Sequence, residues 1–211
     1  MIDSFAESAQ QYDAWFDQNE LVYQSELFAI KAFLPPEGRG LEIGVGTGRF
    51  AAPLGIEVGV EPAKAMAEIA RGLGIIVYEA YAEKLPFVHG SFDFVLMVTV
   101  LCFLKDPIRA LMEARRVLKL QGKLIIGVID PDTPLGRSYE KKKVVNKFYR
   151  KARFYPVGLI LEWLKTLGFG SIETSQTIFQ ELHLITEMEP MRENHGEGGF
   201  VVISAQKATY P

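Results

Sequence analysis

The fold follows from one short stretch of the chain, Leu41-Glu42-Ile43-Gly44-Val45-Gly46-Thr47-Gly48-Arg49-Phe50. Its apolar start predicts a buried strand, and the glycines at alternating positions predict a tight turn directly after that strand. Glycines let a ligand approach the backbone closely, and the N-terminus of a following helix would offer free N–H groups to it. The dinucleotide fingerprint G-x-G-x-x-G does not fit, because Arg49 stands where its third glycine belongs. The stretch therefore predicts a ligand-binding turn that differs from the dinucleotide-binding fingerprint.

A carboxylate follows the next predicted strand. Residues 56–60 form an apolar run that ends at Glu61, thirteen residues after Gly48. Parallel strands place their carboxyl ends at one edge of a sheet, where Glu61 can accept hydrogen bonds from both hydroxyls of a ribose. An ordinary tight turn would explain the glycines alone, but not their combination with this acid. The pair therefore predicts a ribose-containing ligand.

Strand and helix patterns alternate along the chain. Such alternation is typical of parallel βαβ units with right-handed crossovers, and therefore of an α/β fold. The last two predicted strands have no helix pattern between them, so we expect them to pair antiparallel. The expected strands are residues 40–44, 56–60, 75–78, 92–100, 123–129, 172–179 and 199–206, and the expected helices between them are residues 62–72, 106–118 and 158–167.

Composition limits the class of protein. Hydrophobic residues make up 48% of the chain and charged residues 23%, which is typical of a globular domain. Twenty-three basic against 26 acidic residues give a net charge of −3, which makes a nucleic-acid partner unlikely to be the main one. The single cysteine and three widely spaced histidines predict neither a disulfide framework nor a metal site. No signal-peptide pattern and no apolar run of about 20 residues is present, so we expect a cytoplasmic protein without a membrane span.

These motifs resemble the class I S-adenosylmethionine-dependent methyltransferases, particularly the small-molecule branch that includes quinone-biosynthesis enzymes. Residues 42–48 are similar to the family's first motif, whose turn holds the methionine part of the cofactor, and Glu61 matches its ribose-binding acid. Residues 82–87 with 92–95 resemble the segment that reaches adenine, and residues 115–123 resemble the stretch before the fifth strand. The resemblance covers nearly the whole chain. It implies a three-layer Rossmann-like fold with a seven-stranded, mostly parallel sheet in the order 3-2-1-4-5-7-6 and an antiparallel last strand.

The same resemblance implies transfer of a methyl group from S-adenosylmethionine to a small or medium-sized acceptor by in-line displacement. It carries over a set of cofactor-binding residues, and no metal is implied. These residues are Glu42, Gly44, Val45, Gly46, Gly48, Glu61, Pro62, Met66, Ala82, Glu83 and Thr99.

Two positions depart from the family pattern. Tyr81 replaces the aspartate that precedes Ala82 in the family, which leaves the backbone of Ala82 or Glu83 to contact adenine. Residues 50–55 leave room for only a very short first helix, and Pro53 lies inside it. We therefore expect a weaker contribution of the helix N-terminus to cofactor binding than in the family.

No catalytic residue is assigned. The cofactor carries the reactive group, so the protein mainly positions the acceptor and excludes water, and a base is needed only where the acceptor must lose a proton. Three residues are weak candidates for contacts with the acceptor. Tyr12 belongs to the N-terminal segment, Thr99 lies near the carboxyl end of the fourth strand, and His195 has an unperturbed pKa suited to a base. Each residue also has a structural alternative: Tyr12 could pack in the core, Thr99 could bond to the backbone, and His195 could simply be solvated.

Eight basic residues gather within residues 137–153 and alternate with aromatic ones. We expect a lid whose charges face water and whose aromatic rings turn inward. Two alternatives stay open: an RNA or protein methyltransferase that uses this basic lid, and an S-adenosylmethionine-binding protein without catalysis. Monomer and homodimer both stay open as well.

We expect one methyltransferase domain over residues 1–211, in four parts. These are an N-terminal helical cap over 1–36, a cofactor-binding core over 37–131, a basic lid insertion over 132–157, and a C-terminal helix with an antiparallel strand pair over 158–211.

Overall fold

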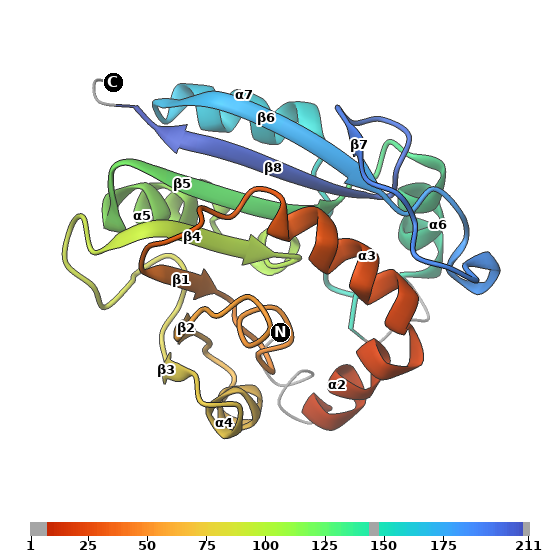
Figure 1. Cartoon of the computed structure of the whole chain (residues 1–211), viewed down its shortest axis with the longest axis horizontal. Coiled ribbons are helices and arrows are strands. Elements are labelled where there is room, and N and C mark those ends of the chain that lie inside the picture. Colours follow the sequence, from red (N-terminus) through yellow and green to blue (C-terminus); the bar gives the residue numbers. More distant parts are fainter. Residues whose placement is uncertain (1–7, 144–147, 209–211) are drawn as a thin grey trace.

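A computed structural model describes residues 8–143 and 148–208 of the chain (Figure 1). The first seven residues of the predicted cap and Lys147 of the predicted lid lie outside this range. The described strands are β1 (Gly40–Ile43), β2 (Val58–Val60), β3 (Ile76–Tyr78), β4 (Phe92–Val98), β5 (Leu118–Ile129), β6 (Phe169–Thr177), β7 (Arg192–Glu193) and β8 (Phe200–Lys207).

All of these strands join one sheet, in the order β3-β2-β1-β4-β5-β8-β6-β7. The first five strands pair in parallel, whereas β8 runs antiparallel to both β5 and β6. The expected order and the antiparallel last strand are confirmed. The sheet has eight strands rather than seven, because the two-residue β7 adds an edge strand beside β6. A pair of exposed residues carries no alternating pattern from which such a strand could be predicted.

Helices cover both faces of the sheet. The helices are α2 (Ala9–Gln18), α3 (Glu20–Lys31), α4 (Lys64–Gly72), α5 (Pro107–Val117), α6 (Pro134–Lys142) and α7 (Val157–Thr166), with single 3-10 turns η1 (Leu101–Phe103) and η2 (Leu182–Leu184).

Alternating side chains of β4 show the resulting layers. Val95 and Met97 point into the core that α5 and α7 cover. Phe94, Leu96 and Val98 point to the opposite face, where their core also holds residues of α3, α4 and α6. Both faces of the strand are buried, which explains its nearly continuous apolar sequence. In Figure 1, α3 lies in front of the sheet, while α5 and α7 lie behind it.

The connection from β1 to β2 contains no helix. Hydrogen-bonded turns take its place, with the N–H of Gly48 donating to the carbonyl of Val45 at 2.9 Å and that of Ala52 to Gly48 at 3.0 Å. Pro53 cannot donate the N–H that would continue a helix here. The expected very short first helix is thus reduced to turns, and the glycine-rich stretch receives no helix N-terminus.

Candidate functional site

A cleft of about 710 Å³ opens at the carboxyl ends of β1, β2 and β4. Its walls come from the loops after these strands, from the loop after β3, and from the side chain of Tyr12 on α2. The sequence-predicted residues that the structure brings together in this cleft are Tyr12, Gly44, Gly46, Glu61, Pro62, Met66, Ala82, Glu83 and Thr99.

Gly48 and Val45, two of the predicted residues, do not line the cleft. A Cβ atom on Gly48 would lie 2.7 Å from the Cδ1 of Ile75 and 3.3 Å from the Cα of Ala70, so this glycine lets the turn pack against α4. The side chain of Val45 is buried and fills the space in front of Gly59, where a Cβ atom would approach it to 2.6 Å. Both residues shape the turn from behind the cleft.

Glu42 also lies behind the cleft, in β1, with a side chain that is 2% exposed. Its Oε2 atom has no hydrogen-bond partner within the described part of the chain. Burial raises the pKa of this carboxyl well above its usual range. A buried acceptor without a donor requires one from water or from a ligand. Glu42 therefore leaves an open polar position next to the glycine turn.

Glu61 joins the two loops that form the floor of the cleft. Its Oε2 atom accepts the N–H of Gly46 at 3.1 Å, and its Oε1 atom accepts the N–H of Ala63 at 2.8 Å. Burial raises the pKa of this carboxyl. Each carboxylate oxygen has a second lone pair, so the side chain can still accept two hydroxyl groups from the cleft side.

Gly44 and Gly46 shape the turn above that floor. Both adopt left-handed backbone conformations, with φ of 73° and 55°. A Cβ atom on Gly44 would lie 2.4 Å from a methyl of Val100, whereas one on Gly46 would enter the cleft, 3.8 Å from Met66 and 3.9 Å from Tyr12. The first glycine allows close packing, and the second leaves room for a ligand.

In the loop after β3, the side chain of Glu83 has a structural role. Its Oε1 atom accepts the backbone N–H groups of Lys105 at 3.1 Å and Asp106 at 3.4 Å. Tyr81, which replaces the family's aspartate, lines the cleft with an exposed side chain. Ala82 and Glu83, whose backbone is expected to contact adenine, both line the cleft beside Tyr81.

An ion pair on α5 holds this loop in place. Arg116 donates to Glu113 from Nε at 2.7 Å and to the carbonyls of Leu85 and Phe87 at 3.2 and 2.7 Å. The other oxygen of Glu113 accepts the N–H of Leu85 at 2.8 Å. Sequence reasoning missed this role. The sequence feature that could have indicated this role is the spacing of Glu113 and Arg116, three positions apart on a predicted helix.

Tyr12 and Thr99 meet at the other end of the cleft. Both residues line the cleft, and burial raises the pKa of Tyr12 far above its usual range, so this phenol stays neutral. Thr99 ends β4 with a φ of 48°, a strained conformation for a β-branched residue that is typical of functional sites. The ring of Tyr12 also packs edge-on against Phe148, with centroids 5.6 Å apart. The N-terminal helices and the predicted lid thus touch over the cleft.

His195 does not belong to this site. It is exposed on the segment between β7 and β8, it does not line the cleft, and its Nδ1 atom lies 3.4 Å from the hydroxyl of Thr174. The geometry gives no support to its candidate role as a base.

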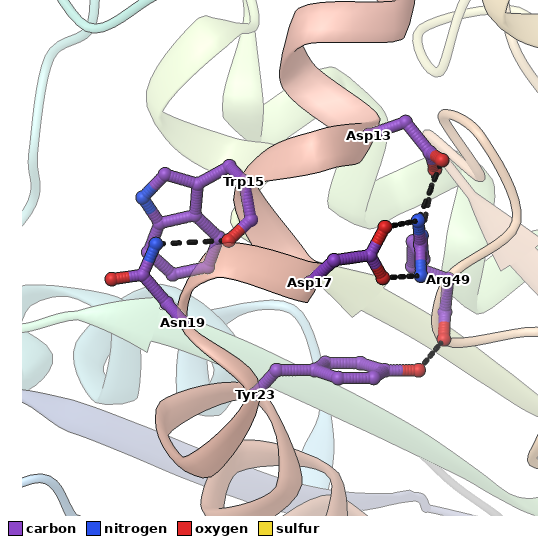
Figure 2. A network of polar contacts seen from close by, with 6 residues as sticks. All are labelled: Asp13, Trp15, Asp17, Asn19, Tyr23 and Arg49. Carbon is purple, nitrogen blue, oxygen red and sulfur yellow. Dashed lines mark hydrogen bonds and ion pairs between the residues drawn. The ribbon is translucent and has the colours of Figure 1, made fainter.

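Arg49 fastens the cap to the glycine turn (Figure 2). Its guanidinium donates to both carboxylate oxygens of Asp13 at 2.7 and 2.6 Å and to Asp17 at 2.7 Å. The hydroxyl of Tyr23 donates to the carbonyl of Arg49. Hydrogen bonding to Arg49 lowers the pKa of Asp13. The sequence showed Arg49 only as a break in a fingerprint, although Asp13 and Asp17 lie four positions apart on one helix face.

The predicted lid packs its rings inward and pairs part of its charge. Tyr149 lies 5.6 Å from both Tyr139 and Phe154, measured between ring centroids. Lys142 pairs with Glu181 at 3.2 Å. In the described residues no group of three or more potential ligand side chains could hold a metal ion. No helix among these residues is long and apolar enough to cross a membrane.

Comparisons with known proteins identify the family of the chain. A family model described as a methyltransferase domain matches residues 41–126. An uncharacterized protein of Methanocaldococcus jannaschii is 51% identical over 98% of this chain and 100% of its own length. The crystal structure of an S-adenosylmethionine-dependent methyltransferase from Thermotoga maritima, named a possible histamine N-methyltransferase, is 48% identical, with a TM-score of 0.95 over 98% of this chain and 100% of that one.

A more distant relative belongs to the branch that the sequence resembles. The ubiquinone/menaquinone biosynthesis C-methyltransferase of Stenotrophomonas maltophilia is 25% identical over 93% of this chain and 80% of its own length. Fold, motifs and relatives lead to one conclusion. The chain belongs to the S-adenosylmethionine-dependent methyltransferases, and it is an enzyme with S-adenosylmethionine as its cofactor.

Proposed function

We propose that the enzyme methylates a small or medium-sized molecule enclosed between the cleft and its cap. The contact of Tyr12 with Phe148 carries this proposal, because it closes the acceptor end of the cleft with segments from two distant parts of the chain. A polymer would need an open approach at this point. The names of the Thermotoga and Stenotrophomonas relatives also refer to low-molecular-weight acceptors.

The residues of the cleft fit the cofactor. Glu61 would accept hydrogen bonds from the ribose, the turn at Gly44 and Gly46 would face the methionine part, and Pro62 and Met66 would flank adenine. When bound, S-adenosylmethionine supplies a methyl group on a sulfonium, which needs no further activation.

The protein's own contribution is then to hold the acceptor in line and to keep water out. Thr99 and the neutral phenol of Tyr12 can donate or accept hydrogen bonds where the acceptor would lie. A phenol whose pKa is raised is a poor base at neutral pH. These two residues therefore serve to position the acceptor rather than to remove its proton.

The proposal can be tested with cell extract and cofactor that is radiolabelled in the methyl group. We expect label in the low-molecular-weight fraction, and none when Glu61→Ala replaces the wild-type enzyme. Glu79→Ala is the matched control, since Glu79 follows the neighbouring strand β3 and lies outside the cleft. Label in RNA or protein would contradict the proposal, and cofactor binding without any labelled product would favour a non-catalytic binding protein.

A further inference from the structure

Asp106 lines the cofactor cleft at the point where the chain passes from β4 and η1 into α5. One oxygen of its carboxylate caps this helix, because Oδ1 accepts the N–H of Arg109 at 2.9 Å. Pro107 takes the first position of α5, where its fixed φ suits the start of a helix. The carboxyl group of Asp106 is therefore held in one place at the wall of the cleft.

The loop after β3 fixes Asp106 from a second side. The Oε1 atom of Glu83 accepts the backbone N–H groups of Lys105 and Asp106. The carbonyl of Glu83 accepts a long hydrogen bond from Nε of Arg109, at 3.4 Å. These contacts place Asp106 next to Ala82 and Glu83, the two residues whose backbone is expected to contact adenine.

The second oxygen of the Asp106 carboxylate is open to a ligand. Within residues 8–143 and 148–208, Oδ2 of Asp106 receives no hydrogen bond and takes part in no ion pair. A carboxylate oxygen can accept two hydrogen bonds. The residue is exposed, so a donor on the ligand would replace solvent at this atom.

The orientation proposed for the cofactor turns its base toward Asp106. Glu61 at the end of β2 would take the ribose, and the turn at Gly44 and Gly46 would take the methionine part. The base then extends away from that turn, toward the loop after β3 that Asp106 adjoins. The present inference rests on this orientation, which belongs to the proposed function.

Adenine carries an exocyclic amino group, which donates hydrogen bonds and requires acceptors where a protein encloses it. Tyr81, at the position of the family's aspartate, supplies no carboxylate. Glu61 already accepts two backbone N–H groups of the floor, and Glu83 directs one oxygen to two N–H groups of the next loop. The ammonium group of Lys105 can only donate. Asp106 combines an unpartnered carboxylate oxygen with a place beside the base.

We propose that Asp106 binds the exocyclic amino group of adenine through Oδ2 and thereby selects an adenosyl cofactor. An ionised acceptor forms a stronger hydrogen bond with an amino group than a neutral acceptor does. A base with a keto oxygen at the same position would bring two acceptors together, which costs affinity. Recognition of the amino group thus comes from the start of α5 in this chain, and not from the position of Tyr81.

The test compares S-adenosylhomocysteine with its 6-deamino analogue, in which a hydrogen atom replaces the amino group of the purine. Calorimetric titration of the enzyme measures both affinities without any methyl acceptor. We expect the wild-type enzyme to bind S-adenosylhomocysteine about tenfold more tightly than the analogue. Asp106→Ser should lose this preference, because serine caps the helix with its one oxygen and has no second oxygen for the base.

Two variants control for the neighbouring groups. Glu79→Ala removes an acid that follows β3 but lies outside the cleft, and it should keep the full preference. Tyr81→Phe removes only the hydroxyl group of a neighbouring residue and should keep it too. Asp106→Ser should melt close to the wild-type temperature, since the helix cap is retained. If it does not fold, Asp106→Asn decides the question, because asparagine caps equally well and its neutral amide should reduce the preference.

The outcomes separate this inference from the function on which it rests. Equal affinities of the wild-type enzyme for the two ligands, or a preference that survives in Asp106→Ser, would overturn the role of Asp106. Loss of the preference in Tyr81→Phe would assign the amino group to the tyrosine hydroxyl instead. Wild-type affinity of Glu61→Ala for S-adenosylhomocysteine would overturn both the orientation and this inference. Methyl label confined to RNA or protein would contradict only the proposed acceptor, because the titration contains none.

Discussion

Arg49 donates two parallel hydrogen bonds to the carboxylate of Asp13, from Nε to Oδ1 at 2.7 Å and from Nη2 to Oδ2 at 2.6 Å. Arg49 belongs to the glycine-rich turn beside the cleft, and Asp13 directly follows Tyr12, whose side chain lines the cleft from α2. The pair therefore sets the position of the Tyr12 ring relative to the turn. This ion pair therefore joins the glycine-rich turn to the N-terminal helix α2 as one structural unit.

Replacing Arg49 should loosen that unit. Lysine cannot reproduce two parallel hydrogen bonds to one carboxylate, so Arg49→Lys should lower kcat/KM for the acceptor about tenfold and stability by about 1 kcal/mol. Cofactor affinity should change little, because no Arg49 atom lines the cleft. Steady-state kinetics and calorimetry measure the two effects. Asp17→Ala is the milder control, since Asp17 is 68% exposed in its side chain. Unchanged kinetics in Arg49→Lys would show that the cap is positioned by other contacts.

Glu61→Gln should weaken cofactor binding by about tenfold to a hundredfold. The amide group of glutamine would turn a donor toward the N–H of either Gly46 or Ala63, both of which now donate to the carboxylate. The same change would remove one acceptor for the ribose. Calorimetric titration with S-adenosylhomocysteine measures the effect, and wild-type affinity in this variant would mean that the ribose binds elsewhere.

Gly46→Ala should reduce cofactor affinity more than stability. Its φ of 55° strains an alanine by about 1 kcal/mol, and the new methyl group would enter the cleft between Met66 and Tyr12. Gly55→Ala is a matched control, because Gly55 has a φ of 68° but no atom within 4 Å of an added Cβ. Both variants should melt at similar temperatures, and only the first should bind cofactor poorly. Equal affinities would place the cofactor away from this turn.

The stability of the ligand-free enzyme should fall as the pH rises through neutrality. Burial raises the pKa of Glu26 from its usual 4.5 to about 8 in the folded protein. Between these values unfolding releases a proton, so rising pH favours the unfolded chain. Relative to wild type, Glu26→Gln should gain up to about 3 kcal/mol at pH 7 and little at pH 4. Denaturant titrations at both pH values provide the comparison. A gain that does not depend on pH would show that the folded protein keeps Glu26 ionised.

The strands and the floor of the cleft were predictable because their determinants are local, whereas the order of the strands was implied only by the resemblance to a known family. Apolar runs, alternating glycines and Glu61 at a strand end are read within a few residues of one another. Arg49 and Asp13 are 36 positions apart, and only the packing of α2 onto the turn brings them together. In the sequence, Glu26 resembles any surface acid of an amphipathic helix, because its burial arises only from the packing of other segments. Long-range pairs of polar residues leave no comparable pattern in the sequence.

The turns between β1 and β2 also bear on which cofactors this protein can accept. A helix beginning after the glycines would point the positive end of its dipole at the ligand, an arrangement that suits the phosphates of a dinucleotide. Without that helix, the described side chains beside the turn on the cleft side include the carboxyl group of Glu61 and no basic residue. The turn therefore offers a pyrophosphate neither a helix dipole nor a basic side chain of the cleft. A cofactor without phosphate groups does not need either, so the loss of one helix disfavours dinucleotides.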